Sequence, residues 1–354
     1  MKRYGYIFEK VCDLENIKAA IYKAARGKKH RRAVRRILDN ADTAALRIKE
    51  LLESGNYKPS PTTKFLIRSG THKKEREIQR PAFFPDQIIH WALMLQIEKY
   101  IVKNAYNFSC GSMPGKGVHY AKRYICRWLR TDRKNTKYCL KLDIKKFYQN
   151  IDREALKTSF ARKFKDKRLL ELIAAIIDSD GQGIPIGNYT SQWFANFFLS
   201  PLDHFIKQEL KVKYYVRYMD DMVLLGRNKK ELHKIRKIIA EFISPYGIEL
   251  RSNWQVFRVD KRDIDFLGFR FFRNKTTLRK RIALNIRRRV KKIYKKEQAT
   301  YKDACAVISS LGWIKHTDSH YFFVTYIAPY INIKQLKEVI RRESRKQHLT
   351  RCTV

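Results

Sequence analysis

The sequence predicts an α+β fold, with strands concentrated in its middle and helices on both sides. The alternating apolar and polar residues of 137–144 and the β-branched and aromatic residues of 213–227 indicate strands. The composition of 16–53 and the apolar spacing within 273–354 indicate helices. Because hydrophobic residues make up 44% of the 354 residues and aromatic residues 13%, the chain has enough apolar material for a core.

The chain is strongly basic, with 77 Lys and Arg against 34 Asp and Glu and a formal net charge of +43. Such an excess requires a polyanionic partner, and nucleic acid is the usual one. A membrane surface is the alternative, but the sequence shows no long apolar run, no signal peptide and no lipidation motif. Ribosomal and histone-like proteins share this charge but are rarely as long or as aromatic. We therefore expect nucleic-acid binding without membrane contact.

The six cysteines are scattered, and no two have the C-x-x-C spacing of a zinc knuckle or a redox pair. Single cysteines in a chain without an export signal fit a reducing compartment. We therefore expect a cytoplasmic protein in which the cysteines are small hydrophobic residues.

The helical segment 16–53 contains a dense basic cluster, and Gly27 predicts a turn between two helices inside it. A solvated helix face is the simpler explanation of the cluster. However, eight cations without compensating acids repel one another unless phosphates lie against them. We expect Arg31, Arg32 and Arg35 to contact nucleic acid. The cluster comprises Lys23, Arg26, Lys28, Lys29, Arg31, Arg32, Arg35 and Arg36.

Further elements follow from the same patterns. Strands are expected at 63–69, 75–80, 137–144, 213–227 (a hairpin) and 250–259 (a strand pair). Helices are expected at 86–103, 190–210 and 229–243, with another helix after the Gly-rich segment 110–120.

The C-terminal stretch 273–354 carries 21 Lys and Arg against five Asp and Glu. Its apolar positions Ile282, Ile286, Val290 and Ile293 recur at helical spacing. This predicts a helix with one apolar seam and a basic exterior suited to a duplex backbone. The cations expected to contact nucleic acid are Arg287, Arg288, Lys291 and Lys292.

Three acidic residues in this acid-poor chain are candidates for metal-dependent chemistry. Adjacent side chains on an extended strand point to opposite faces, so Asp220 and Asp221 could share one site only in the tight turn of a hairpin. Adjacent acids in a turn are usually just solvated, but these two lie between apolar strands. Asp143 is the third candidate; alone, it could equally be a strand-end acid paired with Lys145 or Lys146. Two divalent ions held by converging carboxylates would support phosphoryl transfer.

These residues lie in motifs that resemble those of reverse transcriptases. LDIKKFY at 142–148, IGNYTSQ at 186–192, YMDD at 218–221 and FLGF at 266–269 have the order and spacing of the palm motifs. REIQRP at 76–81 and PDQIIHWAL at 85–93 resemble fingers motifs of bacterial members.

The resemblance implies a right-hand polymerase with fingers, a palm of antiparallel sheet plus helices, and a helical thumb. The implied divisions are a basic helical extension at 1–58, fingers at 59–136 with part of 150–185, a palm at 137–272 and a basic thumb at 273–354.

The resemblance also assigns roles to individual residues. Asp143, Asp220 and Asp221, with the carbonyl of Ile144, would hold two Mg²⁺ ions, with Mn²⁺ as the alternative metal. Tyr148 would exclude ribonucleotides by clashing with the 2′-hydroxyl. The nucleotide-binding set would be Arg68, Arg76, Tyr148, Ile186, Gly187 and Gln192. The residues at the primer would be Tyr218, Met219, Phe266, Leu267 and Gly268.

Two positions depart from most bacterial relatives. Ile186 replaces Gln and Gln192 replaces Pro, a form similar to that of reverse transcriptases of bacterial or phage diversity-generating retroelements. This implies that the enzyme copies a template-repeat RNA into cDNA and makes errors at template adenines. The implied partners are dNTPs, a primer and an accessory basic oligomeric protein. Ser252–Gln255 also lacks the lysine that many polymerases have as a proposed general acid.

Two alternatives remain open. The first is a reverse transcriptase of the retron, group II intron-like or defence-associated type. The second is an RNA-binding scaffold that retains a polymerase fold without activity.

Overall fold

The computed structural model describes the chain except for residues 1–2, 70–73, 180, 297 and 353–354, and it divides the chain into two compact units. The first unit comprises 1–117, 140–224 and 230–255. The second comprises 118–139, 225–229 and 256–354. Within the described residues, no helix combines the length and the apolar character that a membrane span requires.

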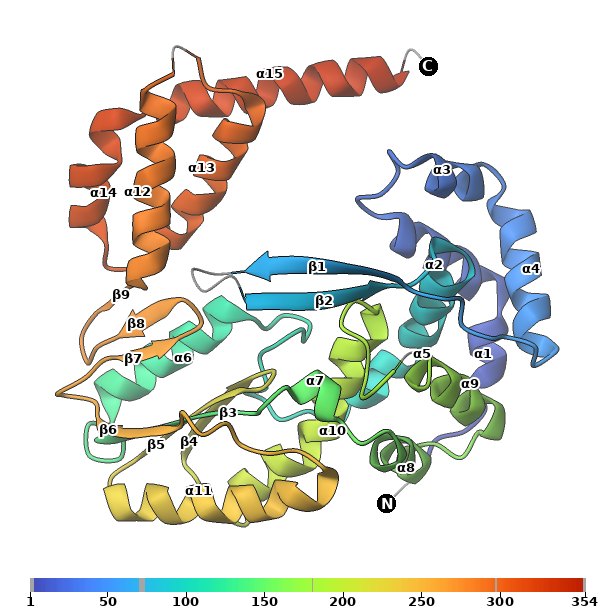
Figure 1. Ribbon diagram of the computed structural model, residues 1–354, viewed down its shortest axis with the longest axis horizontal. Coiled ribbons are helices and arrows are strands. Elements are labelled where there is room, and N and C mark those ends of the chain that lie inside the picture. The colour runs from blue at the N-terminus through green and yellow to red at the C-terminus, as the bar shows by residue number, and fades with distance from the viewer. Residues whose placement is uncertain (1–2, 70–73, 180, 297, 353–354) are drawn as a thin grey trace. The chain divides into compact units, whose positions relative to one another are not determined.

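Helices dominate the N-terminal part of the first unit, as Figure 1 shows. Asp13 caps α2 by accepting hydrogen bonds from the amides of Glu15 and Asn16. Ile17 and Ile21 of α2 are fully buried, and this helix packs against α4 and α5. The turn predicted at Gly27 is present, with φ of 74°. The first helices are α1 (Phe8–Cys12), α2 (Leu14–Ala25), α3 (Arg32–Asp39), α4 (Ala41–Glu53) and α5 (Ile88–Asn104), the last preceded by a π-helical turn at Phe83–Gln87.

The two expected strands before α5 form an antiparallel hairpin. β1 (Thr63–Ser69) pairs with β2 (Lys74–Arg80), with Phe65 opposite Ile78. Arg68 and Arg76 lie in these strands, but their side chains fall outside the described residues.

A four-stranded sheet in the order β4-β5-β3-β6 carries the candidate acids (Figure 1). Its strands are β3 (Tyr138–Asp143), β4 (Tyr214–Tyr218), β5 (Asp221–Gly226) and β6 (Gln255–Arg258). The prediction of a strand pair at 250–259 was wrong, because only β6 forms there. Leu250 makes a single bridge to Ile144, and the chain then turns before Gln255.

Helices connect these strands. The helix expected at 190–210 is α10 (Tyr189–Gln208), and the helix expected at 229–243 is α11 (Lys229–Ile243). The remaining connections are α6 (Val118–Thr131), α7 (Phe147–Asn150), α8 (Arg153–Lys163), α9 (Lys167–Ile177) and the 3₁₀ turn Ser244–Tyr246.

The C-terminal part of the second unit combines a small sheet with helices. The three-stranded antiparallel sheet is β7 (Ile264–Phe266), β8 (Phe269–Phe271) and β9 (Thr276–Leu278). Ile286, Val290 and Ile293 of α12 are buried, which confirms the predicted apolar seam. The helices here are α12 (Lys280–Tyr294), α13 (Tyr301–Lys315), α14 (His320–Tyr326) and α15 (Ile333–Cys352), with a 3₁₀ turn at Ala328–Tyr330.

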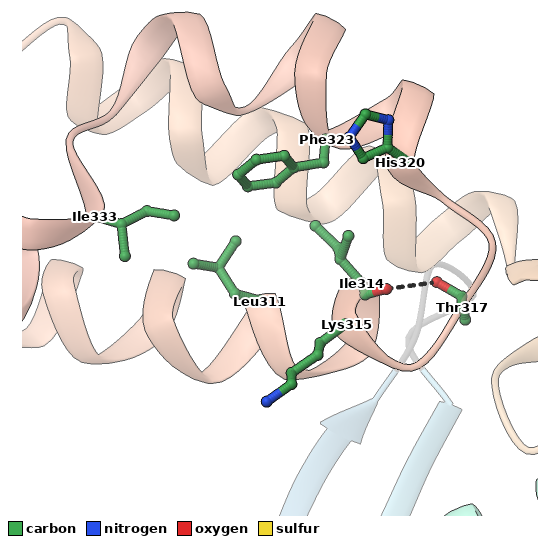
Figure 2. Close-up of a pocket in the computed structure, with 7 residues that line it drawn as sticks. All are labelled: Leu311, Ile314, Lys315, Thr317, His320, Phe323 and Ile333. Carbon is green, nitrogen blue, oxygen red and sulfur yellow. Dashed lines mark hydrogen bonds between the residues drawn. The ribbon is translucent and has the colours of Figure 1, made fainter.

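Between α13, α14 and the start of α15 lies a cavity of about 340 Å³ (Figure 2). Leu311, Ile314, Phe323 and Ile333 give it an apolar lining. Its polar lining residues are Lys315, Thr317 and His320.

Candidate active site

The two adjacent acids lie at the tip of the β4–β5 hairpin. Only Met219 and Asp220 separate the two strands, so the turn is a tight one. The strand interiors are buried, including Val216 on β4 and Val223 on β5. Asp220 and Asp221 are half-buried at the end of this apolar ribbon, where a carboxylate keeps access to solvent and ligands.

Asp143 reaches the same region from another strand. It is the last residue of β3, which is the neighbour of β5 in the sheet. The next residue, Ile144, donates its backbone N–H to the carbonyl of Asp220 at 3.3 Å. The main chain therefore brings Asp143 beside the hairpin acids, although they are far apart in sequence.

Arg251 is tied to Asp143 twice. Its backbone N–H donates to the Asp143 carbonyl at 2.7 Å, and its Nη1 lies 2.7 Å from Asp143 Oδ2. The side chains of Arg251 and Asp143 are 35% and 19% exposed. This is a partly solvated ion pair, which another cation can replace at modest cost.

The donor set fits a hard divalent cation by its chemistry. Carboxylates and a backbone carbonyl are the oxygen ligands that Mg²⁺ prefers. In the described part of the chain, however, no three His, Cys, Asp or Glu side chains are grouped closely enough to hold a metal ion. Arg251 already binds one oxygen of Asp143. An ion would therefore have to compete with Arg251 for Asp143.

Tyr148 lies close to these acids. It is half-buried, and burial, followed by the negative charge of Asp220, raises the pKa of its phenol above the ordinary value. The ring is thus neutral at physiological pH. The Tyr148 carbonyl accepts a hydrogen bond from the amide of Ile184 at 2.8 Å. This contact fixes the 183–187 loop next to Tyr148.

The close approach that requires Gly187 is to β2. Gly187 has φ of 139°, and a Cβ there would lie 2.1 Å from the carbonyl oxygen of Gln79. The backbone N–H of Gln79 donates a hydrogen bond to the backbone carbonyl of Ile186 at 2.8 Å. The nucleotide-binding role of Gly187 stays a prediction; within the chain, its close neighbour is a strand backbone. Gln192 is exposed on the first turn of α10 and accepts a hydrogen bond from Ser112 Oγ at 2.7 Å.

The residues expected at the primer are divided between the two units. Tyr218 and Met219 belong to the hairpin of the first unit. Phe266, Leu267 and Gly268 belong to the second, where Leu267 and Gly268 form the β7–β8 turn with φ of 54° and 87°. The side chain of Phe266 is buried.

The cations expected to contact nucleic acid are mostly exposed. Arg31, Arg32 and Arg35 are exposed at the start of α3 and along it. On α12, the guanidinium of Arg287 lies 4.5 Å from the centre of the Tyr326 ring. The other three predicted cations of α12 are exposed: Arg288, Lys291 and Lys292.

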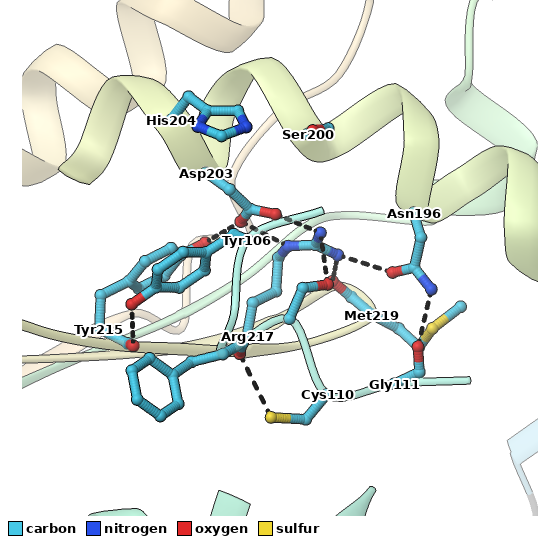
Figure 3. A network of polar contacts seen from close by, with 12 residues as sticks. Tyr106, Cys110, Gly111, Asn196, Ser200, Asp203, His204, Tyr215, Arg217 and Met219 are labelled. Atoms are coloured by element: carbon cyan, nitrogen blue, oxygen red, sulfur yellow. Dashed lines mark hydrogen bonds and ion pairs between the residues drawn. The ribbon is translucent and has the colours of Figure 1, made fainter. Parts of the chain in front are cut away.

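The sequence analysis did not predict the buried ion pair that Arg217 of the hairpin forms with Asp203. Arg217 is only 1% exposed and forms an ion pair with Asp203, which is also buried (Figure 3). The signal was present in the sequence: an arginine between Val216 and Tyr218, inside an apolar strand, must have a buried partner. The identity of that partner was not readable. Arg251 was missed as well, because nothing local marks it.

The model of the family reverse transcriptase (RNA-dependent DNA polymerase) matches residues 72–271. The group II intron-encoded protein LtrA of Lactococcus lactis subsp. cremoris is 28% identical over 181 residues, which are 48% of this chain and 29% of that protein. An uncharacterized 91 kDa protein in the cob intron of Schizosaccharomyces pombe is 26% identical over 172 residues, which are 46% of this chain and 20% of that protein. The chain therefore spans less than a third of these curated relatives.

Among solved structures, the apo telomerase of Candida tropicalis is similar, with a TM-score of 0.51 and 15% identity. The match covers 83% of this chain and 59% of that one. This likeness confirms the predicted fold class.

Replacing Arg251 by Ala should strengthen divalent-ion binding, because it removes a cation that competes for Asp143. A partly exposed pair contributes little, so we expect the Kd for Mn²⁺, measured by electron paramagnetic resonance, to fall by about 3-fold. The matched control is Arg258→Ala, which removes an exposed cation of the second unit that pairs with Asp260. Its Kd for Mn²⁺ should equal that of the wild type. A Kd that rises in Arg251→Ala would contradict the competition.

Proposed function

The chain belongs to the reverse transcriptase (RNA-dependent DNA polymerase) family, and we propose that it copies an RNA template into DNA. The observation that carries the proposal is the hydrogen bond from Ile144 to the Asp220 carbonyl, which brings the LDIKKFY and YMDD segments together. In the proposed reaction the primer 3′-hydroxyl attacks the α-phosphate of a deoxynucleoside triphosphate, and pyrophosphate leaves.

The three acids would bind two divalent ions, and the Ile144 carbonyl would complete one coordination shell. When bound, such ions acidify the attacking hydroxyl and neutralise the leaving pyrophosphate. Asp143 would exchange its Arg251 contact for this role.

Other residues would select and hold the nucleotide. The neutral, half-buried ring of Tyr148 next to Asp220 is suited to block a ribose 2′-hydroxyl. Arg68 and Arg76 would grip the triphosphate through their guanidinium groups. The exposed cations of α3 and α12 would neutralise phosphates of the template and the growing strand.

We further propose that copying is error-prone at template adenines, as in a diversity-generating retroelement, with an accessory basic protein as partner. The support is Ile186, whose aliphatic side chain cannot make the hydrogen bonds of an amide beside the templating pair. A group II intron-like reverse transcriptase without this mutagenic role is the second candidate. It is favoured by the 28% identity to LtrA over 181 residues.

Replacing Asp220 and Asp221 together by Ala should reduce primer extension on an RNA template with Mg²⁺ by at least ~1,000-fold, since both hairpin ligands are removed. RNA binding should persist. The double variant Glu15→Ala with Asp42→Ala removes two exposed acids, each paired with Lys18, and should extend primers normally. Persisting synthesis without the hairpin acids would refute the metal role. A wild type that is inactive alone and with its partners would favour the RNA-binding scaffold.

Replacing Ile186 by Gln should lower errors opposite template adenine by about 10-fold, because the amide restores hydrogen bonds that discriminate between base pairs. Sequencing of the cDNA product measures this. The control is Leu46→Gln, which places the same amide at an exposed position on α4 and should leave errors unchanged. An unaltered error spectrum in Ile186→Gln would count against the mutagenic role.

A further inference from the structure

All five N–H groups of the Arg217 guanidinium have acceptors inside the protein (Figure 3). Nε and Nη2 donate to the two carboxylate oxygens of Asp203, at 2.8 and 2.5 Å. Nη2 also donates to Ser109 Oγ at 2.9 Å. Nη1 donates to Asn196 Oδ1 and to the carbonyl oxygen of Met219, both at 3.0 Å. Arg217 therefore joins β4, α10 and residue 109 to the hairpin turn.

The pair is not explained by stability alone. Arg217 and Asp203 are 1% and 0% exposed, and burying two charges removes hydration whose loss offsets much of their mutual attraction. Well-packed apolar residues commonly serve a core as well or better. Tyr215 adds a hydrogen bond to Asp203 at 2.7 Å, so the anion is held from two directions. What an apolar residue could not supply is the donor to the Met219 carbonyl.

That carbonyl belongs to the residue immediately before the acids. Met219 has φ of 55°, a conformation that costs free energy for a non-glycine residue and persists only when its surroundings hold it. Arg217 holds the Met219 carbonyl oxygen.

The 110–111 segment supports the same turn from another direction. A Cβ on Gly111 would lie 2.6 Å from Met219 Sδ and 2.8 Å from the Met219 amide nitrogen, so the two segments are in close contact. Asn196 donates to the Gly111 carbonyl at 2.7 Å and accepts from Arg217. One buried network therefore contacts both Met219 and the segment packed against it.

We propose that Arg217, with Asp203 and Asn196, is a positioning group that fixes the Met219 turn and thereby preorganises Asp220 and Asp221 for divalent ions. The inference rests on the proposed function of those acids. Carboxylates gathered at one site repel one another. If they must first be brought together, part of the free energy of ion binding is spent on that step and the ion binds more weakly. A turn held rigidly by buried hydrogen bonds reduces that cost before the ion arrives.

The test measures ion binding rather than turnover. Arg217→Met removes the donor to Met219, and Gly111→Ala pushes on the same turn without touching the buried charges. Binding of Mn²⁺ to the whole chain with primer–template and a non-reactive nucleotide is followed by electron paramagnetic resonance. Both variants should raise the Kd by at least ~10-fold, which corresponds to about 1.4 kcal/mol. The thermal midpoint is measured alongside.

The matched control is Arg273→Met. Arg273 has a side chain that is 12% exposed, pairs with Asp260 and donates to the hydroxyl and carbonyl of Thr136, all within the second unit. This variant should lose stability but keep its Mn²⁺ Kd within about 2-fold of wild type.

The outcomes separate the positioning role of Arg217 from the proposed polymerase function. An unchanged Kd in folded Gly111→Ala overturns the positioning role, as does a change no larger than that of Arg273→Met; if Arg217→Met does not fold, Gly111→Ala decides alone. A wild type that binds Mn²⁺ in a hairpin-dependent way but incorporates no nucleotide would remove the proposed function and leave the positioning role intact.

Discussion

The hydrogen bond between the Ile144 amide and the Asp220 carbonyl is the constraint on which the candidate site depends. It exists because β3 and β5 are neighbours in the sheet, so the end of one strand meets the start of the other. Buried aliphatic side chains such as Leu142 and Val223 fix that pairing, because a one-residue slip would turn them out of the core. The acids thus owe their proximity to the apolar residues beside them.

The two arginines near the acids act in opposite ways. Arg217 is fully enclosed and its partners are fixed, so it can hold the Met219 carbonyl permanently. Arg251 is 35% exposed and forms a partly solvated ion pair with Asp143, so its contact is exchangeable. Arg217 supports the backbone of the turn, whereas Arg251 neutralises a carboxylate that the proposed divalent ion would have to take over.

Residue patterns within a single segment predicted the helices, strands and turns of that segment. The hairpin around Asp220, the turn at Gly27 and the apolar seam of α12 through Ile286 follow from spacing within one segment. Contacts between distant segments were not predictable in this way. The pairing of Arg217 with Asp203 depends on how α10 lies against β4, and Gly187 faces Gln79 because of where β2 lies. The predicted strand pair at 250–259 failed because Leu250 found only one bridge partner, Ile144.

If Asp143, Asp220 and Asp221 bind the same divalent ions, iron-directed cleavage of the chain will reveal it. Fe²⁺ substituted for Mg²⁺ reacts with added hydrogen peroxide to give Fe³⁺, hydroxide and a hydroxyl radical. The radical cuts the backbone next to the bound ion, and mass spectrometry locates the cuts. Ions shared by the three acids should give cleavage at both 143–144 and 219–221, suppressed by excess Mg²⁺. Cleavage at only one of these segments, or at neither, would contradict it.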